Sequence, residues 1–545
     1  MGTLYYGDNL DVLRSDAFQD ASIDLVYLDP PFNSKRDYNL IFKTPKGRDS
    51  EAQIIAFEDS WHWGEQAERE YEELLHQANT AVTEMIRSFR GFLDQSDMMA
   101  YLVMMANRLL ELRRVLKPTG SLYLHCDPTA SHYLKVVMDT IFGPANFVNE
   151  IVWHRYSRPK GSQFLSRRFG ASTDSILFYG RSENYKFHAD SIRVPIDEKE
   201  MQSRNTHLDE KGPYYSGPLL RSASMGARPN LVYEYQGFTP GPEGWRMTRD
   251  KLTELDAQGD LFWTRSGIPR RKVRPKDNPG RQIDNLWADI EAVGSQAKER
   301  QGYPTQKPLA LLERIIQASS DPGDLVLDPF CGCGTAVHAA EKLGRNWIGI
   351  DITHLAIGLI ERRLRAAFPE IQFDVHGVPK DLAGARDLAA RDKYEFQWWA
   401  CSLVGAQPYQ NKKKGPDAGI DGLIYFQDDQ KSTGKKIVVS VKGGEHVGRT
   451  MIADLKNSVE REGAQIGLFV TLAEPTEPME LEALSGGFYE SPMHGAFRKI
   501  QILTIAGLLA ETQAPRYPDL SRGALSFRKA PVEQGQAEQK RLVEF

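Results

Sequence analysis

Short apolar runs and longer segments of helical spacing alternate over the first part of the chain. The run 22–28, SIDLVYL, has the composition of a buried strand and stops at Pro30 and Pro31, because proline cannot continue ladder pairing. Apolar residues recur at helical spacing from about residue 67 to 116, and a second strand-like run follows at 121–127. This alternation predicts an α/β fold.

A second α/β segment lies much later in the sequence. Residues 324–352 read as strand, glycine loop, helix and strand, which is one βαβ unit. Between the two segments, residues 157–300 are rich in Gly, Pro, Arg and aromatic residues and have few long periodic helices. We therefore predict one domain over residues 1–375 with an inserted module at 157–300.

The α/β rhythm breaks after residue 375, and we predict a linker at 376–392. A second domain follows over 393–510, in the order helix, strand, strand, helix, strand, strand. The tail 511–545 is rich in Pro, Arg, Gln and Glu, and is predicted to be disordered.

Composition is that of an ordinary globular protein, with 41% hydrophobic and 26% charged residues among 545. The sequence has neither a membrane-length apolar run nor a secretory signal, so a soluble, cytoplasmic protein is expected. Four scattered cysteines predict reduced thiols. The net charge of −5 does not by itself indicate a nucleic-acid-binding protein, but local basic clusters can supply a positive surface. These clusters are Arg155, Arg158, Lys160, Arg167 and Arg168; Arg265, Arg270, Arg271, Lys272, Arg274 and Lys276; and Lys412–Lys414.

The glycine loop of the βαβ unit indicates a cofactor site. Gly332 and Gly334 follow Asp328, and such a loop lets backbone N–H groups approach a ligand closely. The next strand ends in Asp351, where nucleotide-binding units carry an acid for ribose hydroxyls. A dinucleotide is the obvious rival ligand, although its fingerprint requires a small residue where this chain has Val337.

The tetrapeptide Asp29-Pro30-Pro31-Phe32 has the chemistry of a clamp for an extruded base. The lone pair of a planar amino group on a base is delocalised into the ring, so the nitrogen is a poor nucleophile. A carboxylate and a backbone carbonyl can hold both N–H hydrogens and favour a pyramidal nitrogen. Asp29 and the carbonyl of Pro30 would form that pair, and Phe32 would offer a stacking face.

With these residues together, the chain resembles the β class of DNA amino-methyltransferases that use S-adenosylmethionine. The resemblance covers about residues 1–370, with the catalytic tetrapeptide first, the cofactor loop last and a target-recognition region between them. It implies a Rossmann-like doubly wound sheet with an inserted target-recognition module. It also implies that the catalytic residues are Asp29, Pro30, Pro31 and Phe32, and that the cofactor-binding residues are Asp8, Thr305, Gln306, Lys307, Asp328, Phe330, Gly332, Gly334, Thr335 and Asp351.

The resemblance implies transfer of a methyl group from S-adenosylmethionine to adenine N6 in double-stranded DNA. The target base would first be flipped out, and no covalent enzyme intermediate would form. Asp29 as the first residue of the tetrapeptide favours adenine over cytosine N4, which stays the alternative. Cys331 and Cys333 then need not be nucleophiles. Aromatic residues among the basic clusters suit contacts with DNA. These are Tyr156, Phe164, Phe169, Phe262 and Trp263.

The second domain resembles the Mrr-type restriction endonucleases, which place a metal-binding acid before a strand that carries an acid or glutamine, one further residue, and a catalytic lysine. Asp421 and Lys442 match that pattern, with Asp421 as the metal ligand, whereas Ser440 departs from it because a hydroxyl is a much weaker Mg²⁺ ligand than a carboxylate. Glu395 on the preceding helix is a further candidate carboxylate. Mg²⁺ is expected only if this domain cleaves DNA.

Other readings stay open from the sequence. A nicotinamide oxidoreductase would explain the glycine loop and Asp351 but not the Asp29 tetrapeptide or the insert. A non-catalytic DNA-binding protein and an RNA substrate are further alternatives. The expected setting is a restriction-modification, defence or epigenetic system, and the sequence leaves open whether the chain forms a homodimer or joins partner subunits.

Overall fold

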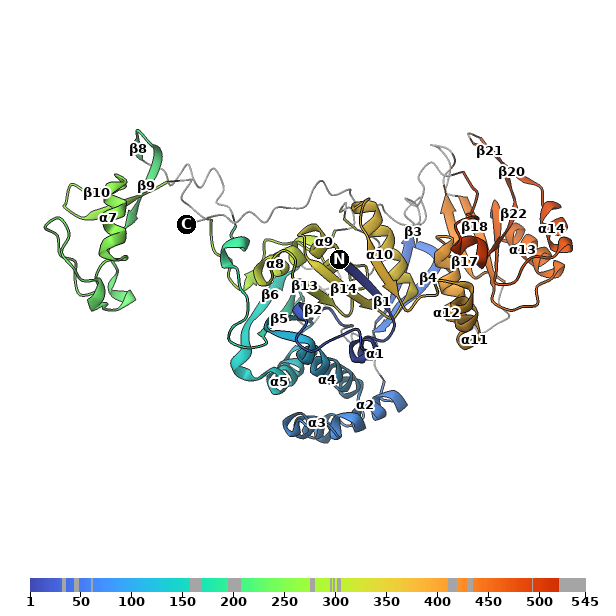
Figure 1. Ribbon diagram of the computed structural model, residues 1–545, viewed down its shortest axis with the longest axis horizontal. Coiled ribbons are helices and arrows are strands. Elements are labelled where there is room, and N and C mark those ends of the chain that lie inside the picture. The colour runs from blue at the N-terminus through green and yellow to red at the C-terminus, as the bar shows by residue number, and fades with distance from the viewer. Residues whose placement is uncertain are drawn as a thin grey trace. The chain divides into compact units, whose positions relative to one another are not determined.

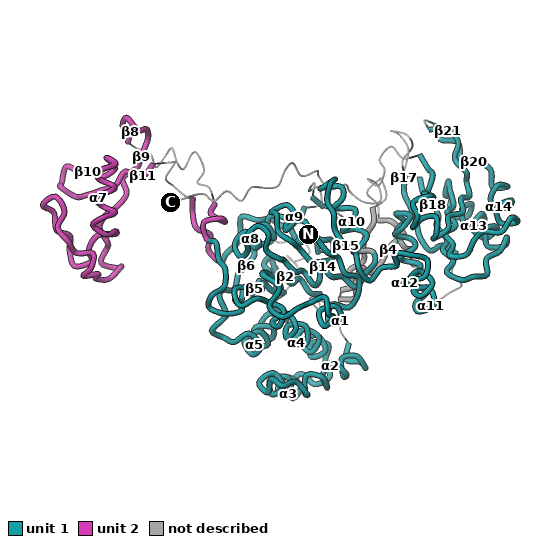
Figure 2. Tube along the Cα trace, in the orientation of Figure 1, with its two compact units in different colours: residues 1–188, 285–539 teal, residues 189–284, 540–545 magenta. Residues whose placement is uncertain are grey.

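The computed structural model describes residues 1–31, 36–43, 49–59, 62–156, 169–194, 207–274, 280–294, 297, 299–300, 305–409, 419–426, 428, 435–492 and 494–518. The described chain divides into two compact units (Figure 2). The first unit contains residues 1–188 and those from 285 onward, and the second consists of residues 189–284. No helix of these described ranges is long and apolar enough to cross a membrane.

A nine-stranded sheet forms the centre of the first unit, in the order β12-β6-β7-β5-β2-β13-β14-β1-β15. Strands β5, β2, β13, β14, β1 and β15 are parallel, whereas β7 runs antiparallel to both β5 and β6. The strands are β1 (Gly2–Tyr6), β2 (Ile23–Leu28), β5 (Leu116–Cys126), β6 (Phe147–His154), β7 (Thr173–Gly180), β12 (Leu286–Trp287), β13 (Leu325–Asp328), β14 (Asn346–Asp351) and β15 (Phe373–His376).

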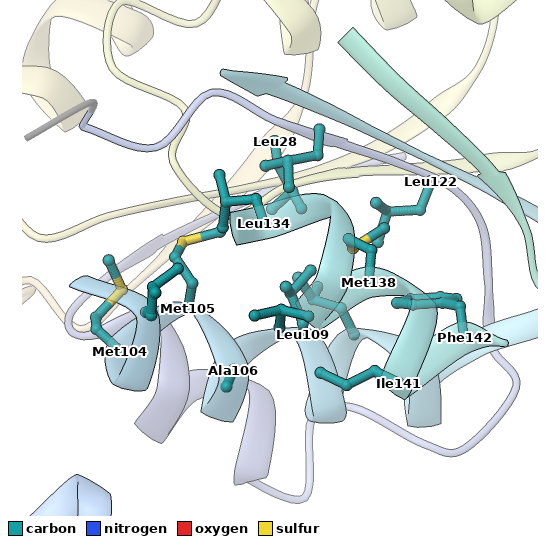
Figure 3. Close-up of a cluster of buried hydrophobic side chains, with 14 of the residues drawn as sticks. Leu28, Met104, Met105, Ala106, Leu109, Leu122, Leu134, Met138, Ile141 and Phe142 are labelled. Carbon is teal, nitrogen blue, oxygen red and sulfur yellow. The ribbon is translucent and has the colours of Figure 1, made fainter. Parts of the chain in front are cut away.

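Helices cover both faces of this sheet, so the predicted doubly wound α/β fold is confirmed (Figure 1). One face carries α1 (Asn9–Arg14), α4 (Asp97–Val115) and α5 (Ser131–Phe142), and the other carries α8 (Leu309–Ser319), α9 (Thr335–Lys342) and α10 (His354–Ala367). Figure 3 shows how α4 and α5 pack against the sheet: Leu109 and Met138 lie beside Leu122, and all three are fully buried. Two amphipathic helices lie outside this layer, α2 (Glu65–Leu75) and α3 (Thr80–Leu93), and a hairpin is formed by β3 (Arg36–Lys43) and β4 (Asp49–Asp59).

Residues 117–120, between the predicted helical segment and the strand-like run at 121–127, are an excursion within one strand. Ile23 pairs with Leu116, and Leu25 already pairs with Ser121, so the four residues between bulge out of the ladder. Gly120 sits where a Cβ would come within 2.9 Å of the backbone oxygen of Asp24. The strand therefore begins before the turn rather than after it.

The second unit has a small antiparallel sheet and its own core. The sheet has the order β10-β11-β9-β8, and Trp245, Leu219 and Leu252 are fully buried against one another. Its elements are β8 (His207–Asp209), β9 (Gly212–Pro218), α7 (Arg249–Ala257), β10 (Leu261–Trp263) and β11 (Pro269–Val273). This unit covers fewer residues than the module predicted at 157–300. Trp287 on β12, for example, is buried in the large sheet, where it pairs with Trp153.

The C-terminal part of the first unit has a five-stranded sheet in the order β16-β17-β18-β19-β22. Its strands are β16 (Gln407–Pro408), β17 (Gly422–Phe426), β18 (Lys435–Lys442), β19 (Ile466–Thr471) and β22 (Ile500–Thr504). Its helices are α11 (Leu382–Arg391), α12 (Lys393–Leu403), α13 (Arg449–Arg461), α14 (Glu477–Leu484) and α15 (Ile505–Leu509), and β20 (Phe488–Ser491) pairs with β21 (Gly495–Arg498).

Both boundaries predicted for this C-terminal part differ from the structure. The predicted linker contains α11, whose Ala385 and Leu388 are buried in the same core as Phe396. The start of the predicted disordered tail is also ordered, because Gln513 accepts a hydrogen bond from the backbone N–H of Thr504 and residues up to 518 are described. Residues 519–545 lie outside the described chain.

Candidate active site

Four parallel strands of the large sheet end side by side and place acidic residues at one edge. Asp29 follows β2, Asp328 ends β13, Asp351 ends β14, and Asp8 lies two residues after β1. The carboxyl ends of parallel strands are where open α/β sheets bind ligands. A cavity of about 300 Å³ lies there, within the range of small-molecule sites. The predicted residues that line it are Asp8, Asp29, Pro30, Pro31, Thr305, Gln306, Lys307, Asp328, Phe330, Gly332, Thr335 and Asp351.

The glycine loop and Asp351 form one hydrogen-bonded unit. The backbone N–H of Gly332 donates to Asp351 Oδ2 at 2.9 Å, and the backbone N–H and hydroxyl of Thr353 donate to Asp351 Oδ1. Gly334 is not among the residues that line the cavity; it makes the left-handed turn into α9 at φ 74°, where a Cβ would come within 2.8 Å of Ile360. Gly334 therefore shapes the loop rather than facing a ligand.

Burial shifts the pKa of two acids in this cavity. It raises the pKa of Asp351 to about 6, although the hydrogen bonds from Thr353 and Gly332 oppose the shift. Burial also raises the pKa of Asp328 well above its usual value, against the hydrogen bond from the Phe330 N–H, and the nearby Asp29 charge adds to the rise. The cavity therefore holds negative charge at a cost in free energy.

Asp29 is paired with Lys307 across the cavity wall. Lys307 Nζ lies 2.6 Å from Asp29 Oδ1 and 2.6 Å from Oδ2, and 3.4 Å from the carbonyl oxygen of Thr305. The Lys307 side chain is 8% exposed. The sequence predicted both residues for the site but not their pairing.

A buried arginine was missed by the sequence analysis. Arg108 on α4 is 4% exposed and lines the cavity, where it donates to both carboxylate oxygens of Asp8, at 3.0 and 2.9 Å, and to Asn9 Oδ1 at 2.5 Å. Asn9 in turn donates to the carbonyl of Pro329 at 2.8 Å. The signal was present, since Asn107 and Arg108 interrupt an otherwise apolar stretch of the helix.

A second group to which the sequence analysis gave no role connects Tyr27, His125 and Asp174. The Tyr27 hydroxyl is 3.1 Å from His125 Nδ1, and His125 Nε2 is 3.2 Å from Asp174 Oδ2. Burial lowers the pKa of His125, so a neutral ring that accepts from Tyr27 and donates to Asp174 fits these contacts. Burial opposes ionisation of Asp174, but the hydrogen bond from His125 and the Arg155 charge outweigh it and lower the pKa. Since Tyr27 lines the cavity, this network fixes part of its wall.

Some predicted residues lie outside the described chain. These include Phe32, Phe164, Lys276, Lys412–Lys414 and most of the first basic cluster, namely Arg158, Lys160, Arg167 and Arg168. Cys331 and Cys333 are described, and burial raises the pKa of both thiols. Neutral thiols are poor nucleophiles, which agrees with the expectation that Cys331 and Cys333 need not act as nucleophiles.

The second basic cluster divides into exposed and buried members. Arg265 and Arg271 are exposed, whereas Arg274 is 2% exposed and bridges Asp209 and Asp260. Arg274 therefore does not belong to the DNA-contacting set expected from the sequence, because its charge is already neutralised within the unit.

The C-terminal candidates come together only in part. Asp421 Oδ2 accepts the backbone N–H of Val441 at 2.6 Å, lies 3.5 Å from the Ser440 hydroxyl, and is 3.9 Å from Lys442 Nζ. Glu395 has different partners: it accepts from the Tyr6 hydroxyl at 2.5 Å and lies 3.5 Å from His354 Nε2. Within the described ranges, no three His, Cys, Asp or Glu side chains gather as a metal site.

Comparison with known proteins matches two parts of the chain to two different families. Residues 23–362 match the DNA methylase family, and residues 388–485 match a restriction endonuclease family. The chain belongs to the DNA methylase family. Its C-terminal part is a restriction-endonuclease-like domain.

Curated relatives resemble the chain over part of their length. The Type II methyltransferase M.EcaI of Enterobacter cloacae is 34% identical over 48% of this chain and 57% of its own. The StyLTI Mod subunit, a Type III restriction-modification enzyme of Salmonella typhimurium, is 26% identical over 62% of this chain and 50% of its own. The DNA adenine methyltransferase YhdJ of Escherichia coli is 44% identical over 22% of this chain and 43% of its own. The chain thus spans about half the length of the first two relatives.

The cavity residues of this DNA methylase suit the S-adenosylmethionine expected from the sequence. Asp351 places carboxylate oxygens at the end of a strand beside a glycine loop, where a ribose would be bound. Phe330 supplies an apolar ring at the wall, and Lys307 supplies a cation for an anionic group. The donor set therefore fits a nucleoside joined to an amino acid.

Proposed function

We propose that this chain transfers a methyl group from S-adenosylmethionine to the N6 amino group of an adenine extruded from double-stranded DNA. The observation that carries the proposal is the position of Asp29, which lies in the same cavity as the glycine loop and Asp351. An acceptor for an amino group and a cofactor site thus share one space of about 300 Å³.

The cofactor would supply the electrophilic methyl group on its sulfonium. Asp351 would accept hydrogen bonds from the ribose hydroxyls while it keeps its bond from the Gly332 N–H. Phe330 would pack against the adenine ring of the cofactor. Lys307 would face the amino-acid end, because it lies beside Asp29, where transfer must occur.

Asp29 and the Pro30 carbonyl would hold the two hydrogens of the target amino group. Bonding of both hydrogens favours a pyramidal nitrogen whose lone pair points toward the methyl group. Pro30 and Pro31 fix the backbone that carries this carbonyl. Asp29 would also receive the proton that the nitrogen loses after transfer.

The substrate is proposed to be duplex DNA with the base flipped out. Unstacking and unpairing a base costs about a few kcal/mol, and hydrogen bonds and stacking in the pocket offset it. The unit 189–284 falls in the predicted target-recognition region, and its exposed Arg265 and Arg271 would contact phosphates. Adenine is preferred over cytosine because the tetrapeptide begins with Asp29, and the relative YhdJ is named an adenine methyltransferase.

The test is transfer of labelled methyl from S-adenosylmethionine to unmethylated genomic DNA, followed by digestion to nucleosides. We expect label in N6-methyladenine with the wild type and with Asp16→Ala, a control at an exposed turn, and none with Asp29→Ala. Label in N4-methylcytosine would overturn the choice of base. Absence of label from DNA of several origins would overturn the activity on DNA.

DNA cleavage by the C-terminal domain is a second candidate, favoured by its match to a restriction endonuclease family and by the Asp421–Lys442 pair. Ser440 supplies a hydroxyl where a stronger ligand is expected, so we infer that the wild-type site binds Mg²⁺ weakly. The same DNA incubated with and without Mg²⁺ tests this candidate. We place both activities in the cytoplasm, and the prediction of a homodimer or partner subunits stays open.

A further inference from the structure

The acceptor on which the proposed function depends is already occupied. Both oxygens of Asp29 are 2.6 Å from Lys307 Nζ. A carboxylate that is bonded to an ammonium through both oxygens is a weak acceptor for the N–H of a neutral amine, because a charged donor binds more strongly than a neutral one. A target base therefore competes with Lys307 for Asp29.

The backbone before Lys307 is held in an uncommon conformation. Thr305 has φ 60°, in the left-handed region that β-branched residues rarely adopt. Its carbonyl oxygen is 3.4 Å from Lys307 Nζ. A conformation of this kind is unfavourable by itself and persists where the surroundings enforce it. The Asp29–Lys307 contact is one of the interactions that hold the segment in place.

The charges of the cavity explain why Lys307 is held at Asp29. The described lining contains four carboxylates, on Asp8, Asp29, Asp328 and Asp351, and two basic side chains, on Arg108 and Lys307. Arg108 is fixed by two bonds to Asp8 and a third to Asn9. Without Lys307, Asp29 would add its full charge beside Asp328, whose pKa burial already raises.

The cofactor brings an additional carboxylate into this arrangement. In-line transfer requires the sulfonium beside the nitrogen that Asp29 holds, and two methylene groups join that sulfur to the carbon bearing the amino-acid carboxylate. Only a few bonds separate this carboxylate from the sulfur, so it must lie close to Asp29. Lys307 is the lining cation already at that position, and it can pair with the new anion by rotation of its flexible side chain.

We propose that Lys307 exchanges partners: it neutralises Asp29 when no cofactor is bound, and it moves to the carboxylate of the cofactor when the cofactor binds. Asp29 then becomes an acceptor for the target amino group only in the loaded enzyme. The cofactor consequently binds before the flipped base is captured. The inference rests on the proposed function, since it assigns the cofactor and the role of Asp29.

Calorimetric binding of two ligands to the full chain tests this exchange without any turnover. S-adenosylhomocysteine carries the carboxylate, and its decarboxylated form keeps the ammonium but lacks the carboxylate. In Asp29→Asn, Lys307 no longer has to leave a charged partner, so we expect S-adenosylhomocysteine to bind about tenfold more tightly than to the wild type. The decarboxylated ligand should change less than twofold, and Asp16→Asn should change neither affinity.

Lys307→Met provides the converse measurement, with thermal unfolding as a check that the variant is folded. It should weaken S-adenosylhomocysteine and leave the decarboxylated ligand unaffected. If the ratio of the two affinities is the same in Asp29→Asn as in the wild type, the exchange is overturned while the proposed function stays intact. This holds whether neither affinity changes or both rise equally. Failure of the wild type to bind either ligand overturns the exchange and the proposed cofactor together.

Discussion

Each of the two candidate sites contains an acid–lysine pair, and the two pairs differ in their separation and in the exposure of the lysine. In the methylase sheet, Lys307 Nζ is 2.6 Å from both oxygens of Asp29, and its side chain is 8% exposed. In the endonuclease-like sheet, Lys442 Nζ is 3.9 Å from Asp421, and its side chain is 31% exposed. The same two residue types therefore form a close pair with a buried lysine in one domain and a loose pair with a half-exposed lysine in the other.

The polar groups around the two acids also differ. Asp29 shares a cavity with Asp8, Asp328 and Asp351, so a ligand that enters meets several directed polar groups. One oxygen of Asp421 is taken by the Val441 N–H at 2.6 Å, with the Ser440 hydroxyl at 3.5 Å. A motif of the right residue types thus predicts where a site lies, whereas the neighbouring groups decide whether it is ready to act.

The strongest test of the comparison is one substitution applied at both pairs. Asp29→Asn should lower the rate of methyl transfer about 10³-fold, because an amide offers one acceptor oxygen in place of a carboxylate and removes the stabilising charge. Asp421→Asn should leave that rate within about twofold, since Asp421 takes no part in the proposed transfer. Initial rates of label transfer to DNA at saturating cofactor measure both.

A stability measurement compares a buried arginine of the methylase cavity with the lysine of the second pair. Arg108 is 4% exposed and holds Asp8 with two hydrogen bonds, so Arg108→Met should lower the free energy of unfolding by about 3 kcal/mol by leaving acids unpaired. Lys442→Met, which removes a half-exposed lysine 3.9 Å from Asp421, should cost less than about 1 kcal/mol. Urea denaturation followed by tryptophan fluorescence measures both changes, and equal losses would mean that enclosure does not decide the energy.

Local signals predicted much of this architecture. Asp29, Asp328 and Asp351 each end a strand-like run, and parallel pairing brings them to one edge without further information. The strand that carries Lys442 was likewise readable from its β-branched residues. Strand ends and glycine loops are local features, so a single sequence reveals them.

Long-range partners were not predictable in the same way. Arg108 and Asp8 are separated by 100 residues, and Lys307 and Asp29 by 278, so no periodicity links them. The helix α11 within the predicted linker was missed because Ala385 and Leu388 give only a short apolar stripe, and packing against Phe396 stabilises it. Ion-pair partners and short helices depend on tertiary contacts that motifs do not encode.

A substitution at Ser440 tests what the second pair lacks. Ser440→Glu adds a carboxylate near Asp421 and should strengthen Mg²⁺ binding about tenfold, because hard cations prefer charged oxygen ligands. Ser440→Gln is the matched control, of similar size but without the charge, and should gain less. Titration calorimetry with MgCl₂ measures the affinity, and incubation with plasmid DNA shows whether cleavage appears. Equal affinity in all three proteins would mean that the side chain at position 440 does not contact the metal.

The smallest expected effect concerns pH at the cofactor end of the cavity. Burial raises the pKa of Asp351 to about 6, so the folded state favours the neutral acid, and the associated stability is lost as the pH rises through about 6. Cofactor affinity should have the opposite pH dependence and rise with pH, since ribose hydroxyls need the ionised carboxylate as an acceptor. Affinity for S-adenosylhomocysteine should therefore be about fivefold lower at pH 5.4 than at pH 7.5.

Asp351→Asn removes the titrating group and identifies the cause of that pH dependence. The variant should bind more weakly at pH 7.5, yet its affinity should hardly change down to pH 5.4, because no proton is taken up at that position. Calorimetry in two buffers of different ionisation enthalpy counts the protons released on binding to the wild type near pH 6. If the variant keeps the wild-type pH dependence, the titrating group is another acid of the cavity, and Asp328 would be the next to substitute, since burial raises its pKa as well.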